Sequence, residues 1–131
     1  MKRLVCLILI IALCSSALLL VACGTKPDDI ITIMKEEYGD KASVSDESIT
    51  QWRDVFSSYY SVNVKSIKSV TKVSVSYDYI YIYEFSSDSD ALDVKYALNR
   101  YLKNEKAVNI DNIVVAGDEE LVDLVMSKIE K

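Results

Sequence analysis

The sequence has no histidine and only three glycines, and each scarcity excludes a class of catalytic site. Without histidine, the chain cannot hold a Ser-His-Asp or Cys-His catalytic system or a histidine-ligated metal. The isolated glycines Gly24, Gly39 and Gly117 cannot form a GxGxxG turn or a phosphate-binding loop. We therefore expect a protein that is not an enzyme, with no catalytic residues and no cofactor.

Cysteine is confined to the start of the chain, at Cys6, Cys14 and Cys23. The remaining sequence has no cysteine pair for an internal disulfide, a Cys-x-x-Cys redox site or a zinc–thiolate cage. Together with the missing histidine, this predicts that the protein holds no metal. The folded domain must then depend on the packing of its core alone.

The first 23 residues combine a basic start, a long apolar run and a small residue before a cysteine. Lys2 and Arg3 precede 19 uncharged residues, 4–22, which is the polarity of a secretory signal. Leu20-Val21-Ala22-Cys23 then resembles the lipobox of bacterial lipoproteins. In that family a peptidase cuts before the cysteine, whose thiol carries a diacylglyceryl group. The resemblance implies cleavage between Ala22 and Cys23 and lipidation of Cys23.

This interpretation divides the chain into a signal peptide (1–22), a lipidated cysteine with a short tether (23–27) and one small domain (28–131). The partner of Cys23 is then membrane lipid, and its acyl chains, such as palmitate, give stable anchoring. The cationic start stays in the cytoplasm, so the domain is expected at the cell membrane, facing outside the cytoplasm. An uncleaved signal anchor, or cleavage after Ala17, remains an alternative.

The domain that follows the apolar run is acidic. Lys2 and Arg3 are two of the 15 basic residues, so 13 remain beside all 20 acidic residues, a net charge of −7 (13 − 20). Phosphate backbones and anionic lipid surfaces repel such a domain. Nucleic acid is therefore not expected as a partner.

Hydrophobic spacing and turn residues predict an α+β fold in a single small domain. The expected order is two helices, a β-hairpin, a helix, a short strand and a C-terminal helix, and this last element is alternatively a strand. The expected ranges are 28–38 for the first helix, 45–59 with its cap for the second, 72–85 for the hairpin, 87–102 with its cap for the third helix, 112–116 for the strand and 118–131 for the last element.

The expected hairpin is dense in β-branched and aromatic residues, which favour strands. A two-residue turn at Tyr77-Asp78 gives it an apolar face and a tyrosine face; their residues are Val73, Val75, Ile80 and Ile82 on the first and Tyr79, Tyr81 and Tyr83 on the second. These tyrosines form either an exposed surface that binds sugars or a peptide, or an ordinary strand face that a helix covers or that is half exposed. A three-residue turn would instead place them on the core face.

Two short motifs have simpler explanations than the chemistry they suggest. Ser69-x-x-Lys72 matches the S-x-x-K of penicillin-recognising enzymes, but a β pattern there separates the two side chains. Asp88, Asp90 and Asp93 suggest calcium, yet the glycine and distal glutamate of the EF-hand loop are missing. Capping of the third helix explains Asp88 and Asp90. Neither motif is expected to form a site.

The segment YIYIYEF (79–85) followed by a capped helix resembles small lipoproteins of Gram-positive bacteria whose domain has no assigned function. The resemblance implies no catalytic residues. We expect a membrane-anchored envelope lipoprotein whose domain binds an envelope protein or a cell-wall glycan. An accessory subunit or inhibitor of an envelope complex is the alternative, and a small hydrolase, which needs convergent carboxylates, is the third.

Overall fold

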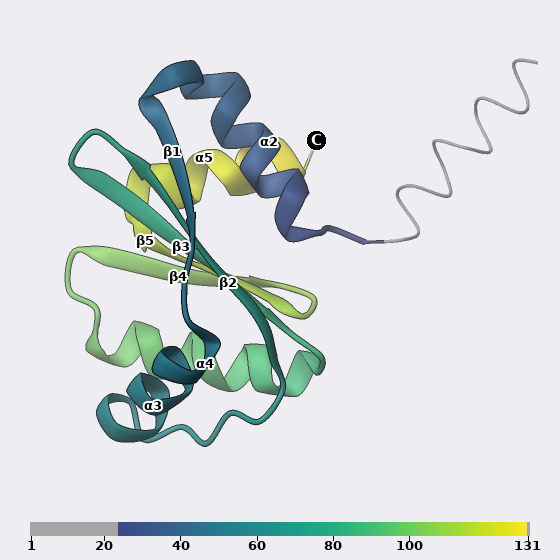
Figure 1. Cartoon of the computed structure of the whole chain (residues 1–131), viewed down its shortest axis with the longest axis vertical. Coiled ribbons are helices and arrows are strands. Elements are labelled where there is room, and N and C mark those ends of the chain that lie inside the picture. Colours follow the sequence, from purple (N-terminus) through teal and green to yellow (C-terminus); the bar gives the residue numbers. More distant parts are fainter. Residues whose placement is uncertain (1–23, 131) are drawn as a thin grey trace, which may run out of the picture.

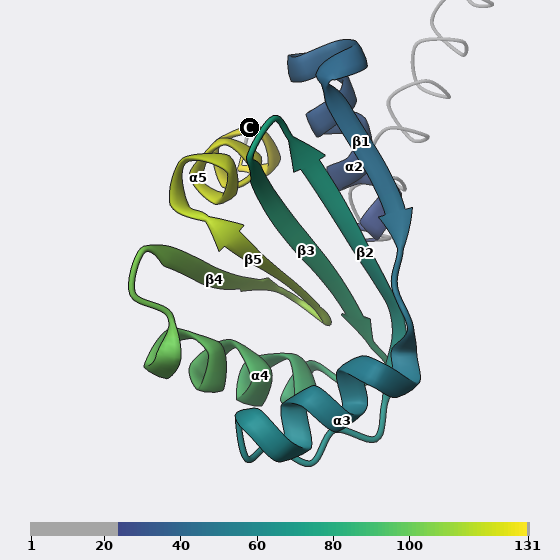
Figure 2. The same cartoon turned by 60° about the vertical axis from the view of Figure 1, so that its left-hand side comes forward.

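The domain is a five-stranded antiparallel sheet between two pairs of helices (Figure 1, Figure 2). The structure, a computed structural model, describes residues 24–130. Helices α2 and α5 cover one face of the sheet, and α3 and α4 cover the other. Along the chain, the elements are α2 (Pro27–Tyr38), a 3-10 turn (Gly39–Lys41), β1 (Ala42–Asp46), α3 (Ile49–Tyr59), β2 (Ile67–Val75), β3 (Asp78–Phe85), α4 (Asp88–Tyr101), β4 (Glu105–Ile110), β5 (Ile113–Asp118) and α5 (Glu119–Ile129).

Strand β3 occupies the centre of the sheet, whose order is β1-β2-β3-β5-β4. Because successive side chains of a strand point to opposite faces, β3 supplies both cores. Its isoleucines pack with α2 and α5; this core contains Ile30, Met34, Val73, Ile80, Ile82, Ile113, Val115 and Val122. Its aromatic residues pack with α3 and α4; this second core contains Phe56, Val70, Tyr83, Phe85, Val94, Leu98 and Val114.

Polar caps fix where the helices begin. The Ser48 hydroxyl accepts the backbone N–H of Gln51 (3.2 Å) at the start of α3, and Ser87 accepts that of Asp90 (3.2 Å) at the start of α4. At the start of α5, the Asp118 carboxylate accepts a backbone N–H in the same way. These caps satisfy N–H groups that have no partner within the helix.

The predicted element order is wrong. The structure is α+β, with four α-helices and a five-stranded sheet in residues 24–130, but strands β1 and β4 were not expected. Strand β1 occupies the polar stretch that was taken as a connection, so α3 is capped by Ser48 rather than by Ser45 or Asp46. Both missed strands lie at edges of the sheet, where one side of the strand has no ladder to enforce a strong pattern.

The hairpin of β2 and β3 turns one residue earlier than predicted, at Ser76-Tyr77, which shifts the pairing of the two strands by two residues. Ser76 has a φ of 57°, a left-handed conformation that fits a tight hairpin turn. Val75 therefore pairs with Asp78 and Val73 with Ile80. A shift of two residues preserves the side-chain alternation, so the predicted apolar and tyrosine faces are confirmed. The three-residue turn is wrong.

Two further expectations concern the helices. The segment 119–129 is a helix, α5, and its alternative as a strand is wrong. Helical spacing places Tyr59 and Tyr101 on the apolar faces of α3 and α4, but they are 79% and 52% exposed. Each lies at the last residue of its helix, beyond the part that packs on the sheet. Among residues 24–130, no helix has both the length and the apolar character needed to cross a bilayer.

Gly117 allows β5 to approach β3 closely, and we expect its replacement to be costly. A Cβ atom there would lie 2.8 Å from Cα of Ile80 and overlap the carbonyl oxygen of Tyr79. Gly117→Ala should lower the free energy of unfolding by about 3 kcal/mol, since backbone cannot give way as a side chain can. Urea denaturation measures this loss. Ser43→Ala, on the exposed edge strand β1, is the control and should change stability by less than about 0.5 kcal/mol. Equal effects of both changes would contradict the close approach.

Candidate functional site

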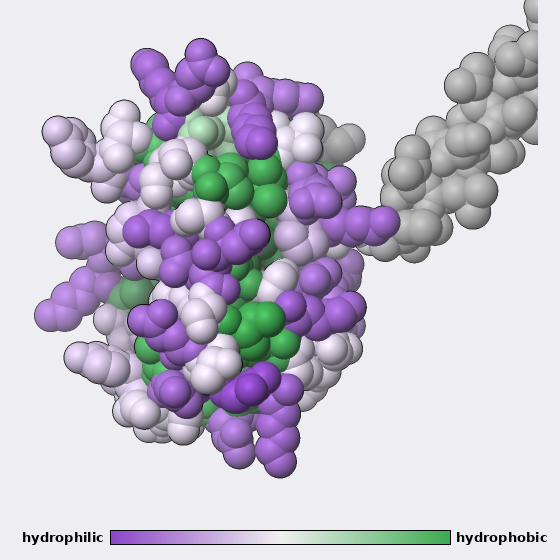
Figure 3. Space-filling view, in the orientation of Figure 1, coloured by the Kyte–Doolittle hydropathy of each residue, from purple (hydrophilic) through white to green (hydrophobic). Residues whose placement is uncertain are grey.

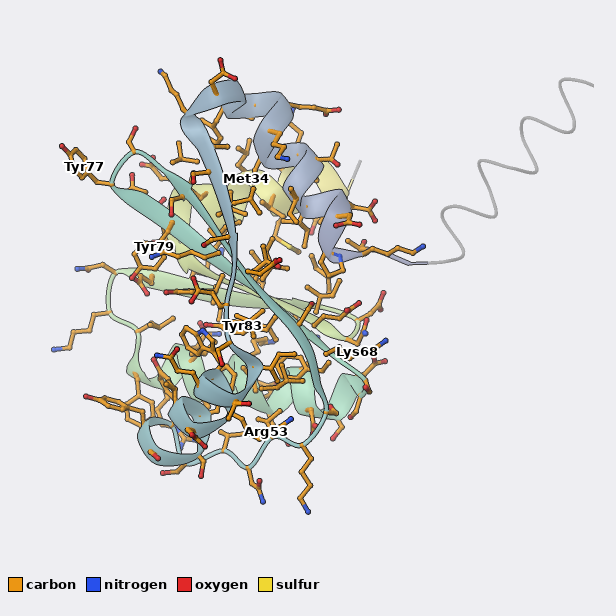
Figure 4. All side chains as sticks on the ribbon, in the orientation of Figure 1. Met34, Arg53, Lys68, Tyr77, Tyr79 and Tyr83 are labelled. Carbon is orange, nitrogen blue, oxygen red and sulfur yellow. The ribbon has the colours of Figure 1, made fainter. Side chains whose placement is uncertain are left out.

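The tyrosines of the predicted binding surface differ in burial. Tyr83 is only 1% exposed, whereas Tyr79 and Tyr81 are half-buried. In Figure 4, Tyr83 lies within the domain and Tyr79 lies nearer the hairpin turn. Tyr83 is therefore not the exposed ligand contact that a fully open tyrosine surface requires. Only Tyr79 and Tyr81 keep part of their surface open.

Trp52 of α3 packs against the tyrosine face, so that its ring stands at a steep angle to the rings of two of the tyrosines. Its ring centroid lies 4.7 Å from that of Tyr81 and 5.1 Å from that of Tyr83, with interplanar angles of 63° and 73°. These are edge-to-face contacts, which aromatic pairs favour. Tyr79 adds another steep angle of 73° against Tyr81 at 5.4 Å. The rings meet as walls and do not form a flat platform.

These walls enclose a recess of about 180 Å³. We call it the aromatic recess; it is lined by Trp52, Tyr60, Tyr79, Tyr81, Tyr83 and Glu105, with Leu98, Leu102 and Ala116 beside them. Its residues come from α3 and the turn after it, from α4 and from three strands. Residues far apart in sequence therefore meet here only because the sheet and the α3–α4 layer pack together.

Among residues 24–130, Glu105, at the start of β4, is the one carboxylate that lines the aromatic recess. Its Oε1 accepts a long hydrogen bond from the Tyr79 hydroxyl (3.4 Å). The side-chain amide of Asn99 holds β4 in place, since it donates to the carbonyl of Ala107 and accepts its N–H, both at 2.9 Å. In residues 24–130 the only ion pair joins Lys106 to Asp123, so Glu105 has no cationic partner there.

A second hollow of about 190 Å³ continues from the aromatic recess, because Tyr79 and Glu105 line both. It extends toward the hairpin turn and is lined in addition by Tyr77, Asp78, Asn104 and Asp118. Asp78 and Asp118 place two more carboxylates there. The opening of the recess is thus aromatic and acidic.

Burial and the nearby carboxylate keep the phenols of the recess neutral. Burial raises the pKa of Tyr79 above its usual 10.0, and the negative charge of Glu105 raises it further. The same two causes raise the pKa of Tyr60. For Tyr83, burial holds the pKa well above 10.0, with smaller contributions from the neighbouring phenols and Glu105. Each hydroxyl is therefore available as a hydrogen-bond donor at neutral pH.

The hydroxyl of Tyr83 has no hydrogen-bond partner within residues 24–130, although the side chain is 99% buried, its exposed fraction being 1%. Every fully enclosed polar side-chain atom of the described residues does have a partner. The Tyr83 oxygen must then keep a small contact with solvent, and the aromatic recess is the cavity it lines. Such a group gains a partner when a ligand or water enters.

Lys72 lies beside Tyr79 and Tyr81 on the side of β3 that is opposite to Glu105. Its Nζ lies 4.6 Å from the ring centroid of Tyr79 and 5.6 Å from that of Tyr81. Lys72 belongs to β2, whereas Glu105 belongs to β4, on the far side of β3 and β5. The two rings therefore lie between an ammonium group and a carboxylate.

The other motifs of the sequence do not form sites. Ser69 and Lys72 lie three residues apart in β2, so their side chains point to opposite faces, as expected. Ser87 caps α4, and Asp90 accepts a hydrogen bond from the Ser66 hydroxyl (2.6 Å). Within residues 24–130, no three cysteine, aspartate or glutamate side chains are grouped closely enough to hold a metal ion. The predicted lipidation and cleavage site, Ala22 and Cys23, lies outside the described residues.

The chain enters the domain at the opposite end of the sheet from the recess opening. Gly24 lies beside Asp111, in the turn between β4 and β5. Tyr77 and Asp78, at the hairpin turn, lie instead near Asp118, at the other end of β5. The length of β5 separates these ends by about 17 Å. In Figure 4, Tyr77 and the start of α2 lie on opposite sides of the domain.

Sequence reasoning missed most of this site. Trp52, the single tryptophan of the sequence, packs against the core as such a residue usually does, but it also lines the recess. Glu105 was not singled out, because β4 was not recognised and no local motif marks it.

Comparison with family models, curated proteins and solved structures found no match for this chain.

Burial of Tyr83 predicts a loss of stability at alkaline pH. Its pKa is raised in the folded chain, so the folded state keeps the proton that the unfolded state releases near pH 10. This contribution is complete below pH 10 and is lost as the pH rises toward the folded-state pKa, by up to about 1.4 kcal/mol per pH unit. Tyr83→Phe should make the fall in unfolding free energy between pH 9.5 and about 11 shallower, as measured by urea denaturation.

The matched control is Tyr77→Phe, which removes a hydroxyl from a fully exposed ring. It should leave the alkaline slope as it is in the parent chain. If Tyr83→Phe gave the same slope as the parent, the hydroxyl of Tyr83 would not be shielded in the folded state.

Proposed function

We propose that the chain is a lipid-anchored protein of the bacterial envelope, held by Cys23, whose domain binds a ligand in the aromatic recess without catalysis. The observation that carries the binding role is an open cavity of aromatic rings that also contains Glu105, a carboxylate with no ion-pair partner among residues 24–130. Ligand sites are typically concave, mostly apolar or aromatic, and carry a few polar groups. The Tyr83 hydroxyl, which lines the same cavity, adds one such group.

The arrangement of the domain supports a binding site that points away from the bilayer. If Cys23 is lipidated, the lipid is attached one residue before Gly24, which lies close to the turn between β4 and β5. The recess opening lies at the other end of the strands. A short tether then keeps the domain near the membrane while Tyr77 and Tyr79 face the space beyond it.

The alternative of an accessory subunit in an envelope complex predicts a large exposed apolar patch. The face drawn in Figure 3 shows hydrophobic residues in separate areas between hydrophilic ones. In residues 24–130, the exposed large hydrophobic residues are mostly tyrosines, whose hydroxyls tolerate water. A binding module with a local site therefore has the better support.

Lipid anchoring has a direct test at Cys23. Cys23→Ser should leave the precursor uncleaved and abolish metabolic labelling with a radioactive or clickable palmitate analogue, because serine lacks the thiol that accepts the lipid. Cys14→Ser is the matched control, since it removes a thiol from the apolar run, and labelling should persist. Normal processing and labelling of Cys23→Ser would refute the anchor.

The binding role predicts that the half-buried Tyr79 and Tyr81 are needed for ligand binding and not for folding. The double variant Tyr79→Ser and Tyr81→Ser, expressed in the producing cells, should lose most crosslinking of the domain to envelope components while remaining folded. A photo-crosslinking residue placed at the exposed position 77 reports this contact. The control is Tyr96→Ser, an exposed tyrosine of α4 that does not line the recess, which should leave the crosslinks unchanged. Unchanged crosslinks in the double variant would contradict a site at the recess.

A further inference from the structure

We infer that the aromatic recess takes the head group of a small organic cation, an alkylammonium group held by ring faces and by Glu105. This inference rests on the proposed function that the recess is the ligand site. It adds the chemical class of the ligand. Four observations support that class: the ring geometry, the carboxylate of Glu105 without an ion-pair partner, the size of the cavity, and the contact of the Lys72 ammonium group with two of the same rings.

The ring geometry favours a cation over a stacked sugar. A cation is attracted to the face of an aromatic ring within about 6 Å of its centroid, and several rings at steep angles can surround one charge. Trp52 and Tyr81 meet at 63°, and Tyr79 and Tyr81 at 73°. Among the described residues that line the recess, the only near-parallel pair is Tyr81 and Tyr83, at 23°, and Tyr83 is buried. A broad flat surface for a sugar ring is thus missing from the recess.

The charge of the recess has the matching sign. Glu105 is half-buried, and among residues 24–130 no cation forms an ion pair with it. A partly buried charge without a partner is unfavourable, so a cationic ligand would gain from neutralising it. Asp78 and Asp118 in the adjoining hollow extend the negative potential toward the opening. The net negative charge of the whole domain also attracts cations.

The protein already uses two of these rings to hold an ammonium group. Nζ of Lys72 lies over Tyr79 and Tyr81 from the β2 side. Glu105 lies on the β4 side, where the recess is open. A ligand cation would therefore occupy the other side of the same aromatic walls. Because Lys72 and such a ligand are both positively charged, Lys72 should weaken the binding of the ligand and not assist it.

The size of the cavity restricts the part of the ligand that enters. A recess of about 180 Å³ is smaller than the roughly 300–1,000 Å³ that drug-sized ligands occupy. It admits a head group, while the rest of the molecule would lie along the hollow toward Tyr77. The Tyr83 hydroxyl provides an oxygen that can accept an ammonium N–H or face a quaternary ammonium.

The test uses Trp52, the only tryptophan of the chain, as a fluorescent reporter in the recess. The full chain is purified in a nonionic polyoxyethylene detergent, which carries neither sugar nor ammonium. Choline, tetramethylammonium and butylammonium are titrated, with 3,3-dimethylbutan-1-ol as the neutral isostere of choline. We expect saturable changes with at least one cation, and binding of the isostere about tenfold weaker than that of choline. Comparing the quaternary cations with butylammonium tells a choline-like head group from a lysine-like one.

Variants identify the groups responsible. Glu105→Gln should weaken choline binding by about tenfold or more, because it removes the charge and keeps the shape. Glu36→Gln, an equal charge change on the exposed face of α2, should shift the dissociation constant by less than about twofold. Lys72→Gln should leave cation binding unchanged or strengthen it at low salt. Weaker cation binding in Lys72→Gln would overturn the inference, because removing a positive charge beside the recess should not weaken the binding of a cation.

The outcome for the ligand class is separable from the outcome for the site. If no cation changes the Trp52 fluorescence, or if the isostere binds as well as choline, the cation inference is wrong. A loss of envelope crosslinks in the Tyr79 and Tyr81 double variant would still support the recess as the binding site. If those crosslinks also persist in the double variant, the proposed function fails as well.

Discussion

The alternation of side chains along β3 is the constraint on which the rest of this domain depends. As the central strand, β3 is covered on both faces, so its two side-chain rows must each fit a helical layer. Ile80 and Ile82 serve the layer of α2 and α5, and the aromatic row serves that of α3 and α4. A slip by one residue would exchange isoleucine and tyrosine between layers of different shape. The pairing of β3 with β2 and β5 therefore positions both cores and the recess together.

The same alternation explains how much of the fold the sequence could predict. The two faces of the hairpin were assigned correctly although its turn was placed one residue late. This error moves the strand pairing by two residues, and only an odd shift of the pairing changes the face. Strands β1 and β4 were missed since ASVSD and EKAVNI are short and polar, and they become strands only by pairing with β2 and β5. Propensity is a weak guide for such edge strands, where tertiary pairing decides.

The candidate site was predictable only in part, for the same reason. Tyr79 and Tyr81 could be found because they belong to a recognisable strand, whose hydrophobic alternation gives them a common face. Glu105 could not, because it is the first residue of an unrecognised strand and stands 24 residues beyond Tyr81 in the chain. The burial of Tyr83 also depends on contact with Trp52 of α3. No local sequence signal reports which helix crosses which strand.

The choice of tyrosine over phenylalanine points to a role beyond packing. The same core contains Phe56 and Phe85, which fill their places without hydroxyls and line no cavity with the recess tyrosines. Tyr83 packs against Phe56, with ring centroids 5.2 Å apart, yet it carries a hydroxyl that has no partner in the described chain. Tyrosine propensity for strands does not account for this, since phenylalanine favours strands as well. The Tyr83 hydroxyl lines the recess with five other aromatic or acidic side chains, so it is placed to contact whatever enters that cavity, a role that phenylalanine could not serve.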